Sequence, residues 1–564
     1  MSTANFSDFI DLGFYRQSNP DLANLTDAQL LNNFTTTGID RGRIFSPFID
    51  LRYYQQSNPD LTGLNNRQLL EHLISSGINE GRTFSPYIDL NYYRQKNPDL
   101  ASFTNLQLWQ HFSKIGFAEG RAGSPIPYNS TFGFGLANAS AAVASATGQR
   151  TFSEVADLAG NSWNLDAIKA PEAWSRGYTG QGIVVAVVDT GVDYNHSDLD
   201  GNIWVNTKEI PGNRKDDDGN GYIDDVRGWD FVSRDNDPMD LEGHGTHVAG
   251  TIAAENNGFG VTGVAPNAKI MPVRVLDASG NGSVLDVAAG IRYAVDNGAK
   301  VINLSLGGDN TTAVEASAIK YAAEKGAVVV YAAGNESQAQ PTYPAKYATH
   351  FGIAVGAVNR NNQMASFSNL SGNLPLDYVN APGVGISSTF LGNSYITLSG
   401  TSMASPHIAG LAALILSSNP NLGPTQVERI LTKTANSSVV QRSSQVLSSN
   451  SSGNFSQAAN VAVDSLTGEQ IDEVSGDFMA ENVPVTQGID RVDGDSIYSA
   501  LNEVDLASTQ GSCRELAIAN LSNELHSLGN STRVSIQDML TDRTLSANSN
   551  NTWMQLTQPG EFLS

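Results

Sequence analysis

Short continuous apolar runs alternate with longer amphipathic stretches between residues 163 and 435. The runs are 183–188, 270–276, 301–306, 328–332 and 353–358. A run of this length without polar alternation is typical of a strand that is buried on both faces of a sheet. The amphipathic stretches 284–297 and 313–325 are each followed by a glycine, which commonly ends a helix. Strands that alternate with helices predict an α/β fold with a parallel sheet and right-handed crossovers.

The first 125 residues carry a different pattern, a repeat in which Ile-Asp-Leu begins at residues 10, 49 and 88, a 39-residue spacing. Asn-Pro-Asp-Leu tetrads and Gly-Arg pairs recur in the same register. Each unit is predicted to hold two short helices, the first ending before the proline and the second carrying apolar residues at helical spacing. Glycine recurs at 38, 77 and 116, and Gly77 is predicted to end the second helix of its unit in a left-handed conformation. The sequence therefore predicts a small all-α array of three stacked units before the α/β region.

Composition divides the rest of the chain. Residues 126–160 are rich in Ala, Ser, Gly and Asn, which is typical of a linker and is compatible with a pro-segment. Residues 161–436 hold the α/β pattern. Residues 437–564 are first rich in Ser and Asn and then acidic, and we expect them to be largely disordered, with one short helix over 514–528.

Charge and cysteine content exclude several classes of protein. The chain has 33 Lys and Arg against 57 Asp and Glu, a net charge of −24, which argues against a nucleic-acid partner and suits divalent cations. Cys513 is the only cysteine, so no internal disulfide forms. No apolar run approaches the roughly 20 residues of a transmembrane helix. The N-terminus shows no signal peptide, so we expect an intracellular location or export by a non-standard route.

Three segments of the α/β region bring together the residue types of a nucleophilic hydrolase. Asp189 ends the first apolar run in Val-Val-Asp-Thr-Gly, and His244 lies in Gly-His-Gly-Thr-His. Ser402 lies in Ser-Gly-Thr-Ser-Met-Ala, just before the apolar run 408–416. The carboxyl end of a parallel strand faces the ligand crevice, and free N–H groups in the first turn of a helix favour a developing anion. These placements predict an acid, a base and a nucleophile.

In the order Asp, His, Ser, these motifs resemble those of the subtilisin-like serine peptidases (subtilases), and the resemblance extends over about residues 163–435. It implies that Asp189 orients the imidazole, that His244 is general base and acid, and that Ser402 is the nucleophile. Asn335, in Ala-Ala-Gly-Asn, matches the asparagine of the oxyanion hole, with the N–H of Ser402 as second donor. The N-terminal units resemble Tyr-Tyr, Asn-Pro-Asp-Leu, Glu-Gly-Arg repeats of secreted and surface-associated bacterial proteins. Such repeats have no defined biochemical role, and we interpret the units as a stacked array that is either structural or docks to a partner or surface.

Other chemistries fit the motifs less well. A zinc site at His244 and His247 would need a third ligand and a metalloprotease-type carboxylate, so His247 is interpreted as a packed helix residue. An aspartic peptidase would need a second Asp-Thr-Gly, and an α/β-hydrolase would need Gly-x-Ser-x-Gly. The rival function is a calcium-binding attachment protein whose protease-like domain is inactive.

The resemblance also implies how a peptide substrate is held. Two backbone segments pair with the substrate as an added strand, which tolerates many sequences and implies broad specificity. The contacting residues are Gly280, Gly282, Ser305, Leu306 and Gly307. Glu336 and Tyr343 lie near the deep wall of the S1 pocket, which receives the side chain before the cleaved bond. Thr342 stands where some relatives carry an acidic residue, so selectivity for Lys or Arg is not implied, although Glu336 could favour a basic side chain.

An acidic run between Asp189 and His244 predicts a calcium site. Its alternating oxygen donors around a glycine resemble the start of an EF-hand loop, but Arg227 stands where that loop ends in glutamate. The predicted ligands are Asp216, Asp218, Asn220, the Tyr222 carbonyl, and Asp224 or Asp225. The alternative is a solvated acidic turn, in which these carboxylates would repel one another.

A second calcium site follows from the resemblance alone. Asp198 matches the ligand aspartate of the subtilases, and loop 255–261 matches their ligand loop. The ligands would be the side chains of Asp198 and Asn257 and the carbonyls of Glu255, Phe259 and Val261. The sequence thus predicts a calcium-dependent subtilisin-like endopeptidase. Cleavage near residues 126–160 is a further hypothesis, since the composition changes there.

Overall fold

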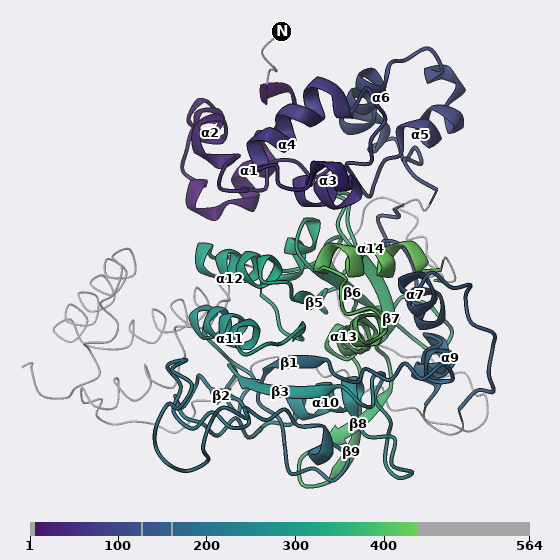
Figure 1. The fold of residues 1–564 in the computed structure, drawn as a ribbon. Coiled ribbons are helices and arrows are strands. Elements are labelled where there is room, and N and C mark those ends of the chain that lie inside the picture. Colours follow the sequence, from purple (N-terminus) through teal and green to yellow (C-terminus); the bar gives the residue numbers. More distant parts are fainter. Residues whose placement is uncertain (1–5, 126–127, 159–161, 309, 437–438, 440–564) are drawn as a thin grey trace, which may run out of the picture. The chain divides into compact units, whose positions relative to one another are not determined.

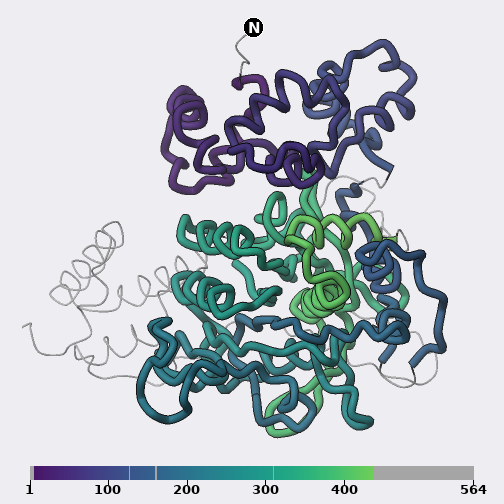
Figure 2. The backbone as a smooth tube through the Cα atoms, viewed as in Figure 1, coloured from purple at the N-terminus to yellow at the C-terminus, as the bar shows by residue number. Residues whose placement is uncertain are grey.

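A parallel seven-stranded sheet lies at the centre of the computed structural model, which describes residues 6–125, 128–158, 162–308, 310–436 and 439 (Figures 1 and 2). All of these residues belong to one structural unit. The strands are β1 Val184–Asp189, β2 Trp229–Asp230, β3 Lys269–Arg274, β4 Val301–Leu304, β5 Val328–Ala332, β6 Ile353–Val358 and β7 Tyr378–Pro382. They pair in parallel in the order β2-β3-β1-β4-β5-β6-β7, which confirms the predicted α/β sheet. The predicted tail helix lies outside the described residues.

Helices cover both faces of this sheet (Figure 1). The α-helices of the described residues, of which α1 to α6 lie apart from the sheet, are α1 Leu12–Ser18, α2 Asp27–Asn33, α3 Leu51–Ser57, α4 Asn66–His72, α5 Leu90–Lys96, α6 Asn105–His111, α7 Ala139–Ala146, α8 Trp163–Ala167, α9 Ala170–Trp174, α10 His244–Ala253, α11 Val284–Asp296, α12 Ala313–Glu324, α13 Thr401–Ser418 and α14 Pro424–Thr434. In β1, Val185 and Val187 belong to the apolar cluster that includes α10 and α13. Ala186 and Val188 belong to the cluster of α11 and α12. Side chains of successive strand residues point to opposite faces of the sheet. A continuous apolar run therefore packs against the helices on both faces.

The chain reverses its direction of progress across the sheet at β1. From β1 it passes to β3 on one side and later to β4 on the other. In open α/β sheets, ligands bind beyond the carboxyl ends of the strands at such a switch point. Asp189 is the last residue of β1 and therefore lies at this position. A separate antiparallel hairpin, β8 Ile386–Phe390 and β9 Ser394–Leu398, precedes α13.

The helices α1 to α6 form three similar units, called here the helical array (residues 6–125). Asp11, Asp50 and Asp89 each cap the first helix of a unit by accepting backbone hydrogen bonds. The expectation for Gly77 is wrong, because it ends a π-helical turn and the chain continues in right-handed conformation at Ile78. A Cβ at Gly38, Gly77 or Gly116 would collide with the hydroxyl of a buried tyrosine. The glycines thus let the helices approach closely.

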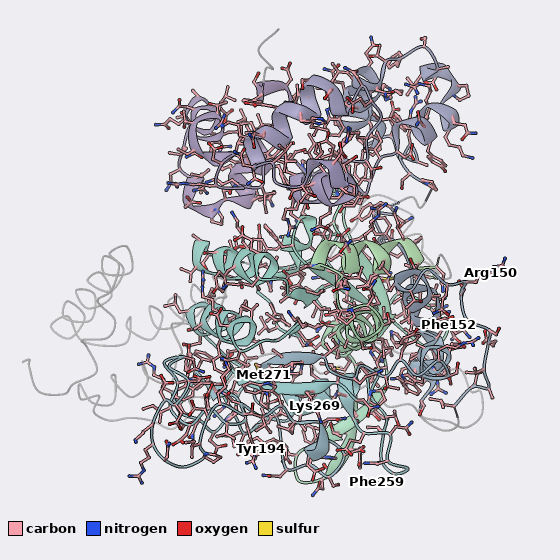
Figure 3. All side chains as sticks on the ribbon, viewed as in Figure 1. Arg150, Phe152, Tyr194, Phe259, Lys269 and Met271 are labelled. Atoms are coloured by element: carbon pink, nitrogen blue, oxygen red, sulfur yellow. The ribbon has the colours of Figure 1, made fainter. Side chains whose placement is uncertain are left out.

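The segment that the composition suggested to be a linker contains a packed helix. Within the described part, residues 128–158, α7 packs against α13 and α14, and Ala142 and Val143 are fully buried. Leu136 N–H donates to the Asn436 carbonyl at 2.8 Å. Phe152 is buried farther along the segment and stacks on Tyr178 with ring centroids 6.2 Å apart (Figure 3). Small residues such as alanine allow this close packing, whereas the same composition also suits flexible linkers.

In the part of the chain that the structure describes, no helix combines the length and the apolar character that crossing a bilayer requires.

Candidate active site

Asp189 and His244 form a hydrogen-bonded pair at the carboxyl end of β1. Asp189 is fully buried, and its Oδ1 lies 2.7 Å from Nδ1 of His244, the first residue of α10. Gly243, just before it, has φ of +111°, a conformation that favours glycine. The carboxylate of Asp240 accepts hydrogen bonds from the N–H groups of Gly243 and Thr246, both at 2.9 Å. The start of α10 is therefore fixed where its imidazole meets Asp189.

The surroundings of His244 favour its protonated form. Burial alone would lower the pKa of His244, but the charge and the hydrogen bond of Asp189 raise it, and Glu242 and Asp240 add to this effect, so that the pKa reaches about 9. Glu242 also accepts a hydrogen bond from the backbone N–H of His244 at 2.7 Å. Since Asp189 holds Nδ1, the other ring nitrogen, Nε2, is available to exchange a proton.

Ser402 is the second residue of α13 and lies beside the end of β4. Its hydroxyl donates to the carbonyl of Ser305 at 3.2 Å, and the Ser305 hydroxyl donates back to the Ser402 carbonyl at 2.8 Å. Ser305 follows β4, and β4 is the neighbour of β1. A hydroxyl has one hydrogen to donate, so Ser402 must rotate this hydroxyl before it can donate to His244. Such a rearrangement is common in free enzymes.

Asn335 follows β5 and is oriented by Thr401. Its side-chain oxygen accepts from the N–H of Thr401 at 2.8 Å and from the Thr401 hydroxyl at 2.9 Å. With the oxygen so engaged, the amide NH₂ points the other way. A Cβ placed on Gly400 would lie 3.5 Å from this Nδ2 and 3.7 Å from the backbone nitrogen of Ser402. The Asn335 amide and the Ser402 N–H, which the sequence analysis assigned to an oxyanion hole, thus both lie near the same point beside Gly400.

Ser305, Leu306 and Gly307 follow β4, and Gly307 lies next to Thr342. The space that the sequence analysis predicts for the P1 side chain beside these residues is called here the substrate recess. A Cβ on Gly307 would lie 3.3 Å from the Thr342 hydroxyl, and a Cβ on Gly334 would lie 2.7 Å from it. Thr342 is itself buried. Gly280 and Gly282 lie elsewhere, in a loop after β3 that Asp277 closes by donating its N–H to the Asn281 carbonyl at 2.7 Å.

Glu336 is exposed and has a partner inside the protein. Its carboxylate accepts from the side-chain amide of Asn369 at 2.7 Å, and its N–H donates to the Asn369 oxygen at 3.2 Å. This pairing weakens the case that Glu336 selects basic substrates. His247 is fully buried, its Nε2 lies 3.0 Å from the Ile386 carbonyl, and burial lowers its pKa to about 3.

The acidic loop brings Asp216 and Asp218 together with Glu209, which sequence reasoning missed. Oxygens of these three carboxylates lie within 4.8 Å of one another. Glu209 is buried, and its Oε1 accepts from the N–H groups of Asp217 and Asp218 at 2.9 and 3.2 Å. Its Oε2 is also buried and has no hydrogen-bond partner among the described residues. In the sequence, Glu209 is marked only by being an acidic residue shortly before the loop.

The structure does not join Asp224 and Asp225 to this cluster. Asp224 accepts hydrogen bonds from the N–H groups of Asn213 and Arg214. Asp225 accepts from the Tyr293 hydroxyl at 2.7 Å and from the side-chain amide of Asn220 at 3.0 Å. Both carboxylates instead stabilise the loop and its contact with α11. The ring of Tyr222 packs edge-on against Tyr293, with centroids 4.8 Å apart.

The residues of the second predicted site do lie together. Asp198 is fully buried, and its Oδ1 accepts from the Asn257 amide at 3.0 Å. Its Oδ2 accepts from the Val261 N–H at 3.0 Å. Burial raises the pKa of Asp198. Glu255 precedes this loop with its carboxylate on the Gly201 N–H at 2.8 Å, and Phe259 is exposed on it (Figure 3).

Comparison with known proteins finds similar sequences over the α/β region. A model of the subtilase family matches residues 180–468, more than half of the 564-residue chain. Subtilisin Savinase of Lederbergia lenta is 43% identical over 275 residues, which cover 49% of this chain and 91% of that protein.

Two further relatives are longer than the matched region. An alkaline protease of Alkalihalobacillus alcalophilus is 44% identical over 49% of this chain and 64% of that protein. A thermophilic serine proteinase of Bacillus sp. (strain AK1) is 48% identical over 44% of this chain and 56% of that protein. The chain thus spans less than two thirds of the length of either. A crystal structure of a cold adapted subtilisin-like serine proteinase is 37% identical, with a TM-score of 0.38 over 45% of this chain and 83% of that chain.

Proposed function

The chain belongs to the subtilase family, and on this premise we propose that it is a serine endopeptidase that hydrolyses peptide bonds of proteins with broad specificity. The observation that carries the proposal is the 2.7 Å contact between the buried carboxylate of Asp189 and His244 Nδ1. It leaves Nε2 of the imidazole as the proton acceptor for a serine. The motif order and the position of Ser402 in the first turn of α13 support Ser402 as that serine.

The reaction then proceeds by acyl transfer. The Ser402 Oγ attacks the carbonyl carbon of the substrate, and its proton passes to Nε2 of His244. Asp189 stabilises the imidazolium and keeps its tautomer. The carbon–nitrogen bond breaks as His244 gives its proton to the leaving amine. Water, activated by the same imidazole, then hydrolyses the ester and frees Ser402.

Negative charge on the carbonyl oxygen is stabilised by two N–H donors. The Asn335 amide and the Ser402 N–H flank the space next to Gly400, where this oxygen would lie. Thr401 already holds the Asn335 oxygen, so the amide needs no reorientation during the reaction. Preorganised donors of this kind stabilise the transition state more than the ground state.

The substrate would be held by the backbone of Gly280–Gly282 and of Ser305–Gly307, with its P1 side chain in the recess lined by Thr342. Main-chain pairing carries little sequence information. The recess wall at Thr342 is uncharged, and Glu336 is paired with Asn369. Both features favour apolar P1 side chains over basic ones, within a broad specificity.

We also propose that calcium binds the acidic loop through Glu209, Asp216 and Asp218. The buried and unpartnered Oε2 of Glu209 supports this, because such an oxygen is costly unless a cation or proton satisfies it. Carboxylate oxygens are the ligands that calcium prefers. The ion would neutralise the three carboxylates and fix the loop, and it takes no part in the reaction.

A second calcium is proposed at Asp198 with the loop around Asn257. A fully buried carboxylate enclosed by a loop rich in backbone oxygens suits a calcium ion. In the structure, Asn257 and Val261 donate hydrogen bonds to Asp198. A calcium ion would replace these bonds. The Asn257 amide would have to rotate so that its oxygen, instead of its NH₂ group, faces the ion, and the first site requires no such change.

The proposed activity is tested with an unfolded protein as substrate. The wild-type chain is expected to cleave it at many positions, and Ser402→Ala is expected to lose turnover while keeping its thermal unfolding temperature. The rival, an inactive calcium-binding attachment protein, would show no cleavage by the wild type. Cleavage that persists in Ser402→Ala would contradict the assignment of the nucleophile.

A further inference from the structure

The segment 333–350, between β5 and the residues before β6, carries Thr342, the residue that we place at the wall of the S1 pocket. Thr342 N–H donates to the Ala333 carbonyl at 3.1 Å, so the segment folds back on its own start. Tyr343 exchanges two backbone hydrogen bonds with Gly308, at 2.8 and 3.0 Å. These bonds tie the stretch that carries Thr342 to the segment that follows β4. A shift of the Tyr343 backbone would therefore strain this pairing and displace Thr342, its neighbour in the chain.

The outer side of the same segment is covered by the first unit of the helical array. Burial raises the pKa of the Tyr343 hydroxyl, and the side chain of Gln17, in α1, opposes this rise from the facing surface. Phe14 is buried beside it, 7% exposed. Phe14, Gln17 and Ile44 face Pro341 and Tyr343 across a cavity of ≈ 40 Å³. This space holds only a few water molecules, so the two surfaces support each other nearly directly.

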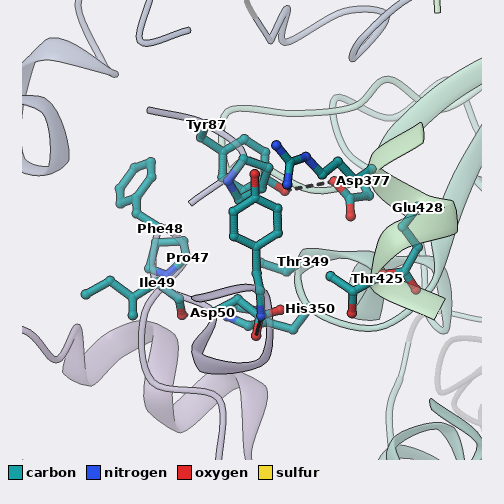
Figure 4. A pocket seen from close by; sticks show the side chains of 13 residues that line it. Pro47, Phe48, Ile49, Asp50, Tyr87, Thr349, His350, Asp377, Thr425 and Glu428 are labelled. Carbon is teal, nitrogen blue, oxygen red and sulfur yellow. Dashed lines mark hydrogen bonds between the residues drawn. The ribbon is translucent and has the colours of Figure 1, made fainter. Parts of the chain in front are cut away.

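The far end of the segment is held by the second unit. The Arg52 guanidinium donates to the His350 carbonyl and lies 4.3 Å from the centre of the Phe351 ring. His350 Nε2 lies 3.2 Å from the Ile49 carbonyl. Figure 4 shows Ile49 and Asp50 of the array next to His350 and Thr349. The array thus contacts the segment near its middle, at Pro341 and Tyr343, and at its end, at His350.

The apolar packing is continuous across this contact. Buried residues of the array, such as Tyr15 and Leu70, belong to the same apolar cluster as Ile408 of α13 and Val355 of β6. A cluster of this kind transmits displacements, because protein interiors are close-packed and compress little. The helical array and the α/β region thus share one apolar core of this kind.

We propose that the helical array positions the S1 wall, with Phe14 and Gln17 holding Tyr343 and thereby setting where Thr342 stands. The inference rests on the proposed peptidase function and adds to it two residues that lie 385 and 388 positions before Ser402 in the chain. Phe14 and Gln17 are positioning residues, because they touch Tyr343 and not the substrate. Of the two roles that the sequence left open for the array, structural and docking, this proposal specifies a structural one.

The effect of losing this support depends on the size of the P1 side chain. A large aromatic side chain fills the recess, so its binding energy comes from contacts with all of the residues that surround it. A methyl group contacts few of these residues and loses little when one of them moves. Small misplacements of a binding pocket lower rates by large factors for substrates that depend on it. The ratio of the two specificities therefore reports the position of the wall.

The repeat provides a matched control. Gln95 occupies in the third unit the position that Gln17 has in the first, and it is exposed on α5. We would measure kcat and KM of Gln17→Ala, Phe14→Ala and Gln95→Ala on two peptides that differ only in Phe or Ala at P1, with active sites titrated. For Gln17→Ala and Phe14→Ala we expect kcat/KM for the Phe peptide to fall about three- to tenfold relative to the Ala peptide, mainly through KM. Gln95→Ala should keep the wild-type ratio.

Each outcome decides the inference. An unchanged Phe/Ala ratio in Gln17→Ala would overturn it, even if Phe14→Ala unfolds the first unit, because Gln17 lies at the surface of α1. An equal change in Gln95→Ala would also overturn it, since that residue lies on another unit. If the wild type hydrolyses neither peptide and reacts with no serine-directed probe, the proposed function fails as well, and the two failures are thereby distinguished.

Discussion

Thr401 donates two hydrogen bonds to the side-chain oxygen of Asn335, at 2.8 Å from its nitrogen and 2.9 Å from its hydroxyl. This double contact decides the orientation of an amide whose two ends are otherwise interchangeable. It directs the NH₂ toward the backbone of Gly400 and Ser402. The arrangement joins the end of β5 to the start of α13, so two elements far apart in sequence define one donor.

Replacement of this amide should affect turnover and not folding. Asn335→Ala is expected to lower kcat by about 10² to 10³, the effect of removing one oxyanion donor. The variant should remain folded, although its thermal unfolding temperature should fall modestly, because the buried Thr401 loses the acceptor of two hydrogen bonds. Steady-state kinetics and thermal unfolding measure both. Asn373→Ala, at another exposed asparagine, serves as control. A kcat for Asn335→Ala equal to that of this control would rule out the oxyanion role.

The pH profile should reflect the raised pKa of His244. The base must be neutral, so kcat/KM is expected to rise with pH along a limb whose midpoint lies above 6.5, the ordinary histidine value, and toward 9. Glu242→Gln removes one of the negative charges that raise this pKa and should move the midpoint to lower pH. Measurement of kcat/KM against pH for both proteins checks this. A midpoint that stays in place in Glu242→Gln would show that Glu242 has no influence on the imidazole.

The same shift has a consequence for stability. Because the folded-state pKa of His244 is raised, its protonation stabilises the native state fully below about pH 6.5, and this contribution is lost as the pH rises toward 9. His244→Ala should remove this part of the pH dependence of the unfolding free energy. Denaturant unfolding of both proteins at several pH values between 6 and 10 measures this. If the unfolding free energy changes with pH in the same way in both proteins, the coupling is absent.

Removal of calcium should destabilise the protein. An ion that binds only the native state adds RT ln(1 + [L]/Kd), about 2.7 kcal/mol per site at a hundredfold excess of ligand. Excess chelator is therefore expected to lower the thermal unfolding temperature. Glu209→Gln, which neutralises one proposed ligand, should reduce the response to added calcium, whereas Glu324→Gln on α12 should not. Identical unfolding temperatures with calcium and with chelator would contradict both proposed sites.

Glu428 of α14 predicts a separate pH effect. Burial raises its pKa from 4.5 to about 7, although the charge of Arg52 opposes the shift, and its Oε1 accepts from the Gly352 N–H at 2.8 Å. A raised pKa means that the protonated carboxyl stabilises the native state below pH 4.5 and that this stability is lost as the pH passes 7. Glu428→Gln keeps a hydrogen-bond acceptor for the Gly352 N–H but carries no charge. The variant should therefore be more stable than the wild type only above about pH 7, where Glu428 of the wild type is ionised. Thermal unfolding at pH 4 and pH 8 tests this, and equal differences at both values would refute it.

The sequence was sufficient to predict the sheet because its strands are buried on both faces and leave a continuous apolar signal, as in Ile183–Val188. The residues Asp189 and His244 were also predictable as a pair, because their motifs end a strand and begin a helix. The structure then added what spacing does not encode, such as the hold of Thr401 on Asn335.

Other features depended on the fold itself. Glu209 could not be assigned, since its burial and its approach to Asp216 arise only when the loop closes. Asp224 was overestimated as a ligand because its alternate position in the run resembled a ligand pattern, while its oxygens bond to backbone at Arg214. The segment around α7 was misread because alanine and serine suit both a flexible linker and a closely packed helix. The domain limits predicted from composition, including residues 161–436 for the peptidase, remain predictions.

The most direct measurement of the central claim is labelling of the intact protein with a fluorophosphonate probe, followed by mass spectrometry. The account predicts one covalent adduct per chain on Ser402, lost in Ser402→Ala and formed far more slowly in His244→Ala. An unlabelled wild-type protein, or an adduct that persists in Ser402→Ala, would contradict it.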